Sequence, residues 1–403
     1  MDFNDTPFEA EYRARARSWL AEHAPAHVIP PGTRLPEEEE VARGRAWQRE
    51  LFDGGYAGIA LPVSVGGQGG TILEALVFGE EEAKYLLPKG PCMNIGLKMA
   101  LPVILKHGTP AQIDQFCRKT LRGDLTWCQL FSEPAAGSDL AAMRARGIRD
   151  GDHWVINGQK VWSSWAHLSD WGILVVRTDP AVPKHKGLTF FVVDMKSPGI
   201  AIRPIRQISG ASDFNETFFT DVRIPDEGRI GAVGEGWACC MTVLMGERLN
   251  QGGGEKGRVR DLIAFALATP DGDRSAADNA SIRSQLAQAL AEERAEKYFQ
   301  ARLRTMVSRG ENPGALAAMV KLAYGTRSQK TSGLAMEIRG LDAIAPAPED
   351  GPARRLQQDY IWSTVIRIAG GSDEVLRNQI AERVLGMPGE VRADKDVPFN
   401  QVQ

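Results

Sequence analysis

The spacing of apolar residues changes along the chain. Before about residue 124, apolar side chains recur every three or four positions on a charged background, most clearly over residues 8–20 and 37–52. This spacing places an apolar stripe on each segment and predicts amphipathic helices with connecting loops. Towards the C-terminus, residues 281–308 and 313–338 are long segments with few helix breakers, which favours a helical bundle.

The middle of the chain follows a shorter period. Runs of β-branched and aromatic residues, bounded by Asp-Gly, Asn-Gly, Lys-Gly and Pro-Gly pairs, predict strands joined by tight turns. Strands this closely spaced indicate a compact β-barrel or sandwich. The runs are residues 154–156, 172–176, 188–193 and 217–219.

These patterns predict an α+β chain that is helical at both ends. We expect an N-terminal helical domain over residues 1–124, a central β-domain over 125–235 and a C-terminal four-helix bundle over 236–388. Within the last part, residues 342–351 are predicted to form a loop. Residues 389–403 are predicted to form a polar tail.

Composition and charge remove several classes of function. The chain has 43% hydrophobic and 25% charged residues and a net charge of −3, which is ordinary for a globular protein and gives no field for nucleic acid. No apolar run has the length of a membrane span. The start carries acid where an export signal carries base, and the 5 cysteines lack paired or metal-ligand spacing. We therefore expect reduced thiols and a cytoplasmic protein.

The segment Trp127–Asp139 carries the most information about function. Residues 127–131 form an aromatic and apolar run that predicts a short buried strand. Pro134 lacks an amide hydrogen, and Gly137-Ser138-Asp139 favours a tight turn with free backbone donors and a hydroxyl. Such a strand end is either an ordinary exit into a loop or a shelf for a large planar ligand. The other glycine cluster, residues 66–70, has no preceding strand and no following Lys-Ser or Lys-Thr, so we interpret it as a tight loop.

Two motifs in the β-rich part match a known family. Ser-Glu-Pro-Ala-Ala-Gly-Ser-Asp at residues 132–139 is followed by Asn-Gly-Gln-Lys-Val-Trp-Ser-Ser at 157–164. Their order and spacing resemble the central signature of the acyl-CoA dehydrogenases, flavoproteins that oxidise the Cα–Cβ bond of acyl thioesters. The helical, β, helical order of the chain also resembles that family. The resemblance implies FAD as hydride acceptor, an acyl-CoA substrate and an electron-transfer flavoprotein as the next electron carrier.

The resemblance also implies which residues meet the ligands. Gln129, Phe131 and Ser132 would line the flavin ring, and Trp162 and Ser164 would cover its other face. Gly137 and Ser138 would lie near the pyrophosphate or the CoA moiety. The remaining implied contacts are Ser372 and Glu374 for the cofactor, and Ser138 and Arg248 for the substrate. Trp162 has a competing interpretation as a core aromatic of the β-domain.

The catalytic base departs from the best-known members of the family. Many of them carry a Tyr-Glu-Gly-Thr segment whose glutamate takes the α proton, whereas this chain has Ala369-Gly370-Gly371-Ser372, with Gly370 at the glutamate position. Leu-Met-Gly-Glu-Arg at residues 244–248 instead resembles the segment that carries the base in the isovaleryl-type branch. The resemblance therefore assigns the base to Glu247. Glu374 is the second choice because it lies just beyond the vacated loop position.

Helical spacing supports Glu247 independently of the resemblance. Trp237, Cys240, Leu244 and Glu247 recur at intervals of three, four and three residues, so they share one helix face. A carboxylate on an apolar face loses solvation, which raises its pKa towards the range useful for a base. The alternative is a structural ion pair, because buried acids are commonly paired.

A second departure concerns the adenine half of FAD. Homomeric relatives usually hold it through Arg-x-x-Phe-Gly and Phe-Gly-Gly segments, which are missing from residues 268–274 and 338–341. Either Arg274 or Arg283 substitutes, or another polypeptide supplies the contacts. The first case fits a homodimer or homotetramer and the second an α2β2 heterotetramer. Two further functions stay open: a flavin oxidase or monooxygenase on the same fold, and a non-catalytic or half-site subunit of a heteromer.

Overall fold

The computed structural model covers the chain in two compact units. The structure describes every residue except 1–4, 31–32, 34, 89, 251–258, 310, 312–313, 347–350 and 403. The side chains of residues 245–250, 304 and 307–308 are also outside the described part. One unit comprises residues 1–247 together with 391–403, and the other comprises residues 248–390. The predicted division into three domains stays a prediction.

The first unit begins with helices whose ends follow local sequence signals. Threonines at positions 6, 71 and 109 form capping boxes with the Glu or Gln three residues later, because each side chain satisfies a backbone amide that the first helical turn leaves unpaired. Gly123, at φ 80°, ends the last of these helices in the left-handed conformation. The helices are α1 (Pro7–His23), α2 (Glu37–Asp53), α3 (Ile72–Glu82), α4 (Pro91–Ile95), α5 (Leu101–His107) and α6 (Pro110–Arg122).

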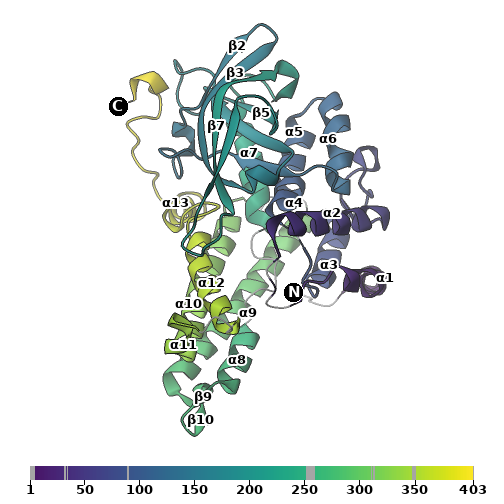
Figure 1. The fold of residues 1–403 in the computed structure, drawn as a ribbon, viewed down its shortest axis with the longest axis vertical. Helices are drawn as coiled ribbons and strands as arrows, with labels where there is room; N and C mark the ends of the chain where they lie inside the picture. The colour runs from purple at the N-terminus through teal and green to yellow at the C-terminus, as the bar shows by residue number, and fades with distance from the viewer. Residues whose placement is uncertain are drawn as a thin grey trace. The chain divides into compact units, whose positions relative to one another are not determined.

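An 8-stranded, mainly antiparallel sheet follows the helices (Figure 1). Its strand order is β6-β7-β3-β2-β4-β5-β8, and β1 pairs in parallel with β4. The four predicted runs lie in β3, β4, β5 and β7, whereas β2, β6 and β8 were not predicted. The strands are β1 (Trp127–Leu130), β2 (Arg146–Asp150), β3 (His153–Ser164), β4 (Trp171–Arg177), β5 (Leu188–Asp194), β6 (Ile200–Ile205), β7 (Phe214–Pro225) and β8 (Arg229–Ile230).

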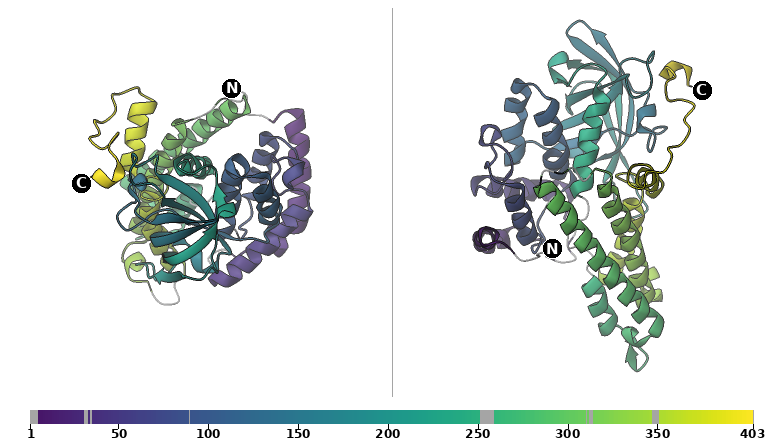
Figure 2. Two further views of the ribbon diagram at one scale, coloured as in Figure 1. Left: turned by 90° about the horizontal axis from the view of Figure 1, so that it is seen from above. Right: turned by 180° about the vertical axis from the view of Figure 1, so that it is seen from behind.

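Strands β4 and β5 are buried on both faces, which explains why they lack polar alternation. Ile173 and Phe190 belong to a core that also contains residues of α5 and α6, and Leu174 and Phe191 belong to a second core between strands. Figure 2, viewed from above, shows the purple and blue helices along one side of the teal strands. The sheet is therefore held between a helical layer and its own inner core.

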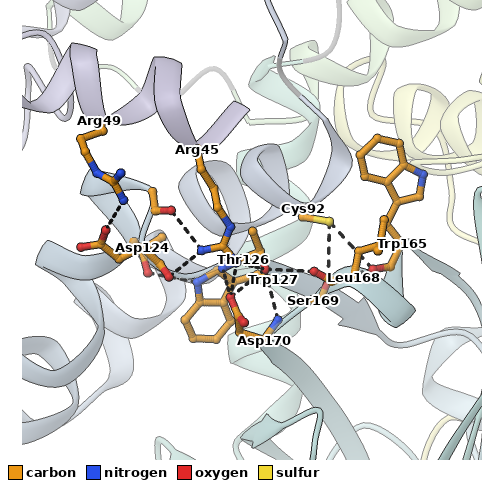
Figure 3. Close-up of polar contacts among 12 residues, drawn as sticks. Arg45, Arg49, Cys92, Asp124, Thr126, Trp127, Trp165, Leu168, Ser169 and Asp170 are labelled. Carbon is orange, nitrogen blue, oxygen red and sulfur yellow. Dashed lines mark hydrogen bonds and ion pairs between the residues drawn. The ribbon is translucent and has the colours of Figure 1, made fainter. Parts of the chain in front are cut away.

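A polar network holds the start of β1 against helix α2 (Figure 3). Arg45 of α2 donates to Asp170 Oδ2 at 2.7 Å, to Thr126 Oγ1 at 3.2 Å and to the carbonyl oxygen of Asp124 at 2.7 Å. Asp170 also accepts from the Thr126 backbone amide at 2.9 Å. Because Asp170 precedes β4 and Thr126 precedes β1, this network fixes where both strands begin.

Helix α7 (Gly236–Asn250) packs its first half against the helix-side core. Cys239, Cys240 and Val243 are fully buried there, and Trp237 and Leu244 are partly buried against the same cluster. The predicted apolar face of this helix is therefore observed as far as Leu244. All 5 cysteines are buried and none forms a disulfide.

The second unit is mainly helical, with helices running alongside one another in Figure 1, and it also contains the short antiparallel pair β9 (Pro270–Asp271) and β10 (Arg274–Ser275). Arg327 on α10 donates to both oxygens of Glu296 on α9 at 2.9 Å, an ion pair that links two neighbouring helices. The predicted loop over 342–351 is partly wrong, because α11 extends to residue 344 and α12 begins at residue 351, while residues 347–350 lie outside the described part. The helices are α8 (Val259–Ala268), α9 (Ala280–Ser308), α10 (Leu316–Arg339), α11 (Leu341–Ile344), α12 (Gly351–Ile366) and α13 (Asp373–Arg383). Across the described residues, no helix is long and apolar enough to cross a membrane.

Candidate active site

The first signature motif forms a closed turn directly after β1. The amide of Glu133 donates to the Ala136 carbonyl at 3.1 Å, and the amide of Ala136 donates back at 3.0 Å. The tight turn therefore lies at Pro134-Ala135, and Gly137-Ser138-Asp139 forms an exposed bend after it. The sequence prediction placed the turn at residues 137–139; proline favours the earlier position because it fixes φ without losing a ladder bond.

The second signature motif contains a bulge at the end of β3. The register against β7 shifts between Lys160 and Ser163, and Trp162 takes a left-handed conformation at φ 62°. The bulge points the indole of Trp162 outward, where it is 57% exposed, although Val161 and Ser163 beside it are buried. Its ring meets Phe214 edge to face at 6.0 Å. The interpretation of Trp162 as a core aromatic is therefore wrong, because a core residue is not exposed in this way.

The two motifs lie against each other. The amide of Val161 donates to the Ser132 carbonyl at 2.8 Å, which joins the end of β1 to β3 beside the bulge. Phe131 is buried and meets Phe190 edge to face at 5.8 Å. The structure thus brings Phe131 and Ser132 next to the segment that carries Trp162 and Ser164.

A buried ion pair, which the sequence reasoning missed, holds this junction. Lys160 Nζ donates to Glu133 Oε1 at 2.8 Å and to the Phe131 carbonyl at 3.0 Å. The Glu133 carboxylate also accepts from the amides of Arg144 and Ala145 at 2.6 and 2.9 Å. Burial lowers the pKa of Lys160, and the Glu133 carboxylate opposes that effect. The sequence signal that could have identified the pair is that Glu133 and Lys160 each stand in one of the two motifs, with opposite charges.

The remaining groups at the junction suit a planar ligand with a polar edge. Ser132, Gln129 and Ser164 are partly buried, and their side chains make no hydrogen bond within the part of the chain that the structure describes. The exposed indole of Trp162 offers a flat apolar contact, and the Ser132 and Ser164 hydroxyls and the Gln129 amide offer hydrogen-bonding groups. The chemistry of these groups is the kind that a flavin ring requires.

The bend at Gly137-Ser138 offers space and backbone donors. A side chain at Gly137 would meet no atom within 4 Å, and both residues are exposed. Asp139, the last residue of the motif, pairs with Lys184 Nζ at 2.7 Å. The bend is thus open to a ligand on one side and anchored on the other.

The base assigned from sequence lies on α7, but its side chain is outside the described residues. The same is true of Arg248, the assigned substrate contact. Both assignments therefore stay predictions that rest on the sequence.

Ser372 and Glu374 lie in the second unit, at the start of α13. Ser372 is the N-cap residue, and its hydroxyl accepts from the Val375 amide at 3.4 Å. Glu374 is exposed, and hydrogen bonds from its own amide and from Ser372 lower the pKa of its carboxyl. Gly370 and Gly371 precede them at φ 68° and 100°, conformations that glycine adopts readily. Arg274 and Arg283, the candidate pyrophosphate cations, are both exposed in this unit.

Comparison with known proteins identifies the family. The models of the N-terminal, middle and C-terminal domains of acyl-CoA dehydrogenase match residues 6–124, 128–222 and 234–385. The chain belongs to the acyl-CoA dehydrogenase family, an oxidoreductase family of FAD-dependent flavoproteins. The predicted fold class, enzyme class and cofactor are thereby confirmed.

Two of the curated relatives come from Mycobacterium tuberculosis. The chain is 36% identical to acyl-CoA dehydrogenase IpdE1 of Mycobacterium tuberculosis, over 95% of this chain and 98% of that protein. It is 38% identical to acyl-CoA dehydrogenase FadE34 of the same organism over 88% of this chain, but it spans only 47% of that protein. Among solved structures, the Tcur3481-Tcur3483 steroid acyl-CoA dehydrogenase superposes with a TM-score of 0.80 at 28% identity, covering 97% of this chain and 100% of that one. The ChsE4-ChsE5 complex of Mycobacterium tuberculosis gives the same values.

Proposed function

We propose that this chain oxidises the Cα–Cβ bond of an acyl-CoA thioester to the trans-2-enoyl thioester, with Glu247 as the base. The observation that carries the proposal is the junction of the two motifs, where Ser132 lies next to the segment that carries Ser164 and the exposed Trp162. Bound there, FAD would accept the hydride that leaves Cβ. The protein must then remove the α proton and polarise the thioester carbonyl.

Glu247 is the preferred base because the other candidate is poorly suited. Gly370 has no side chain to take a proton, and Glu374 is exposed with a lowered pKa, which weakens it as a base. Helix α7 buries Cys240 and partly buries Leu244, which lie seven and three residues before Glu247 on the face predicted to be apolar. A carboxylate that follows such residues on the same face is expected to lose solvation and gain basicity.

We further propose a wide, ring-bearing acyl group as the substrate. The steroid acyl-CoA dehydrogenase among the solved relatives supports this choice, and Gly370 leaves room where other members carry a glutamate. The proposed electron acceptor is an electron-transfer flavoprotein. A flavin oxidase on the same fold is the competing function, and direct reaction of the reduced protein with oxygen distinguishes the two.

We propose an α2β2 heteromer as the working assembly. The two adenine-binding segments of homomeric relatives are missing from this sequence, and one solved relative is the ChsE4-ChsE5 complex. A homomer in which Arg274 or Arg283 binds the pyrophosphate is the alternative. Both arginines are exposed, and among the described residues the side chain of Arg283 makes a single hydrogen bond, of 3.4 Å, to the Asp278 carbonyl.

Anaerobic titration with thioesters tests the proposed reaction. Purified protein, alone and with the products of neighbouring genes, is loaded with FAD and mixed with a linear, a branched and a ring-bearing acyl-CoA. The proposal predicts loss of the visible flavin absorbance, with the ring-bearing thioester reacting fastest. Flavin-loaded protein that none of these thioesters bleaches would contradict the proposed activity.

A further inference from the structure

The C-terminal segment 391–402, which we call the strap, packs onto the first unit instead of trailing from the chain. The amide of Phe399 donates to the Val182 carbonyl and that of Asn400 to the Pro180 carbonyl, both at 2.9 Å. Pro398 and Pro183 form a β-bridge. The strap therefore adds backbone pairing to the loop between β4 and β5, residues 178–187.

Two salt bridges of Lys184 connect the strap to the bend at Gly137-Ser138. Lys184 is 7% exposed and pairs with Asp394 of the strap at 2.6 Å and with Asp139 of the bend at 2.7 Å. Arg392 pairs with the same Asp394 at 3.1 Å. Hydrogen bonds from Arg392 and then Lys184 hold the pKa of Asp394 well below its usual range, so this carboxylate stays charged at neutral pH.

Arg177 makes a second connection between the same two segments. The ring of Phe399 covers its guanidinium at 3.5 Å. Arg177 in turn donates to the carbonyl oxygens of Ala141 at 2.6 Å and Met143 at 3.1 Å, immediately after the bend. Burial lowers the pKa of Arg177 to about 10, and the aromatic cover is one of the contacts that replace its lost hydration.

The loop under the strap also touches α7. His185 meets Trp237 edge to face at 4.7 Å, close to the N-terminus of that helix. The pKa of His185 is lowered, first by burial and then by Arg392 and Lys184, so the ring is neutral at neutral pH. The loop thus contacts the strap, the bend and the helix that carries Glu247.

We propose that the strap is a positioning element for a pyrophosphate-bearing ligand, acting through Lys184 and Arg177 on the bend at Gly137-Ser138. The proposal rests on the proposed function, because the bend is where FAD pyrophosphate or CoA would bind. The bend is exposed and contains a glycine, so its preferred conformation is set by what anchors Asp139 and residues 141–143. Removing the contact of Lys184 or of Arg177 would increase the range of conformations that the bend adopts. Ligand binding would then weaken although no ligand contact is removed.

The test compares two neighbouring carboxylates of the strap. Asp394→Asn removes the salt bridge between the strap and Lys184. Asp396→Asn changes an exposed carboxylate that makes no hydrogen bond or ion pair among the described residues. FAD binding to the apoprotein is measured by flavin fluorescence. Binding of free CoA to the flavin-loaded protein is measured by perturbation of the flavin spectrum, so neither measurement depends on turnover.

We expect Asp394→Asn to raise the Kd of one ligand at least about threefold, towards the roughly tenfold effect of losing a hydrogen bond to a charged group. Asp396→Asn should leave both Kd values unchanged. Asp394→Glu, which keeps the negative charge, should raise the Kd less than Asp394→Asn does. A raised Kd for FAD places the cofactor pyrophosphate at the bend, and a raised Kd for CoA places the thioester there. Phe399→Leu, which removes the aromatic cover from Arg177, should weaken the same ligand.

Two results separate failure of this proposal from failure of the proposed function. If the unmodified protein binds FAD and CoA and both Asp394→Asn and Phe399→Leu bind them equally well, the positioning role is refuted and the proposed function stands. If the unmodified protein and its complexes bind neither ligand, the proposed function fails, and the positioning role with it. Circular dichroism and the thermal midpoint of each variant establish that it is folded.

Discussion

Lys160 and Glu133, which lie 27 residues apart in the sequence, form a buried ion pair at 2.8 Å where the two signature motifs meet. Lys160 is fully buried and Glu133 is 7% exposed. Each side chain makes further hydrogen bonds to the backbone of the strand ends. The pair therefore ties the position of Ser132 to that of β3.

Breaking this pair from one side should be more damaging than removing both charges. Lys160→Met leaves a buried carboxylate without its cation, and loss of one partner of a buried pair costs about 3–5 kcal/mol. Glu133→Gln/Lys160→Met removes both charges, so we expect it to be less destabilised than Lys160→Met alone. The urea midpoints of the unmodified, single and double variants provide the comparison.

Additive effects of the two substitutions would show that the pair contributes no coupling. A double variant that recovers stability but still binds FAD weakly would indicate that the pair also sets the geometry of the motif junction.

Trp162 should contribute to flavin binding and little to folding. Its indole is 57% exposed on a bulge at φ 62°, so replacement by Ala removes a flat contact surface without opening a cavity. An aromatic contact contributes about 0.5–1.5 kcal/mol, so we expect the Kd for FAD to rise about 2- to 10-fold. Titration of the apoprotein with FAD measures the change, and Trp162→Phe should retain most of the affinity.

Trp165 is the matched control for Trp162. It also has a positive φ, at 46°, but it is only 4% exposed. Trp165→Ala should therefore lower the thermal midpoint, as large-to-small changes in a core do. If Trp162→Ala loses as much stability as Trp165→Ala, the flavin interpretation of Trp162 loses its basis.

Much of the fold follows from local signals in the sequence. The apolar period of helices α1 and α2 and the continuous apolar runs of β4 and β5 predict the elements observed. Strand β2 was not predicted because four of its five residues are exposed, and β6 was not predicted because charged and proline residues interrupt its short alternation of Ile200 and Ile202. Their pairing is set by neighbouring strands rather than by their own residues.

The candidate site was less predictable than the fold. The motifs identified Ser132 and Trp162, but the bulge that turns Trp162 outward depends on the register against β7. The role of Lys160 required knowing that the end of β1 crosses β3. Likewise, the polar composition of residues 389–403 predicted a tail, whereas long-range contacts such as Phe399 on Arg177 make part of it a packed segment.

Acid should weaken the packing of α1 against α3 through Glu81. This carboxylate is 2% exposed and accepts from Arg17 at 3.0 and 3.1 Å, while Arg13 and Lys84 pair with it as well. The hydrogen bond from Arg17 is the largest of the interactions that lower the pKa of Glu81 from 4.5 to about 2, and those from Lys84 and Arg13 add to it. Because the folded-state pKa lies below the unfolded value, the stabilisation is present above about pH 4.5 and disappears as pH falls towards about 2.

Glu81→Gln should therefore lower the urea midpoint at pH 7, and the difference from the unmodified protein should shrink below pH 4.5. Glu80→Gln is the control, because Glu80 also pairs with Arg13 but is 40% exposed, and an exposed pair contributes little. A difference that does not change with pH would contradict the role assigned to the Glu81 carboxylate.

The flavin-loaded protein should be an oligomer. The heteromer proposal predicts that the chain alone holds little FAD and that co-expression with a neighbouring partner gives a flavin-loaded α2β2 species by light scattering. A flavin-loaded oligomer of this chain alone, with Arg274→Ala or Arg283→Ala losing the cofactor, would favour the homomer. A stable flavin-loaded monomer would contradict both assemblies.

The most direct test of the proposed reaction is Glu247→Gln in the flavin-loaded protein, mixed anaerobically with the best acyl-CoA thioester in a stopped-flow spectrometer. Gln keeps the size of the side chain but cannot take the α proton, so the rate of flavin bleaching should fall by at least about 100-fold. The FAD content and the Kd for CoA should stay unchanged, and Glu374→Gln should bleach at close to the unmodified rate. Flavin bleaching by Glu247→Gln at a rate near that of the unmodified protein would contradict the account and place the base elsewhere.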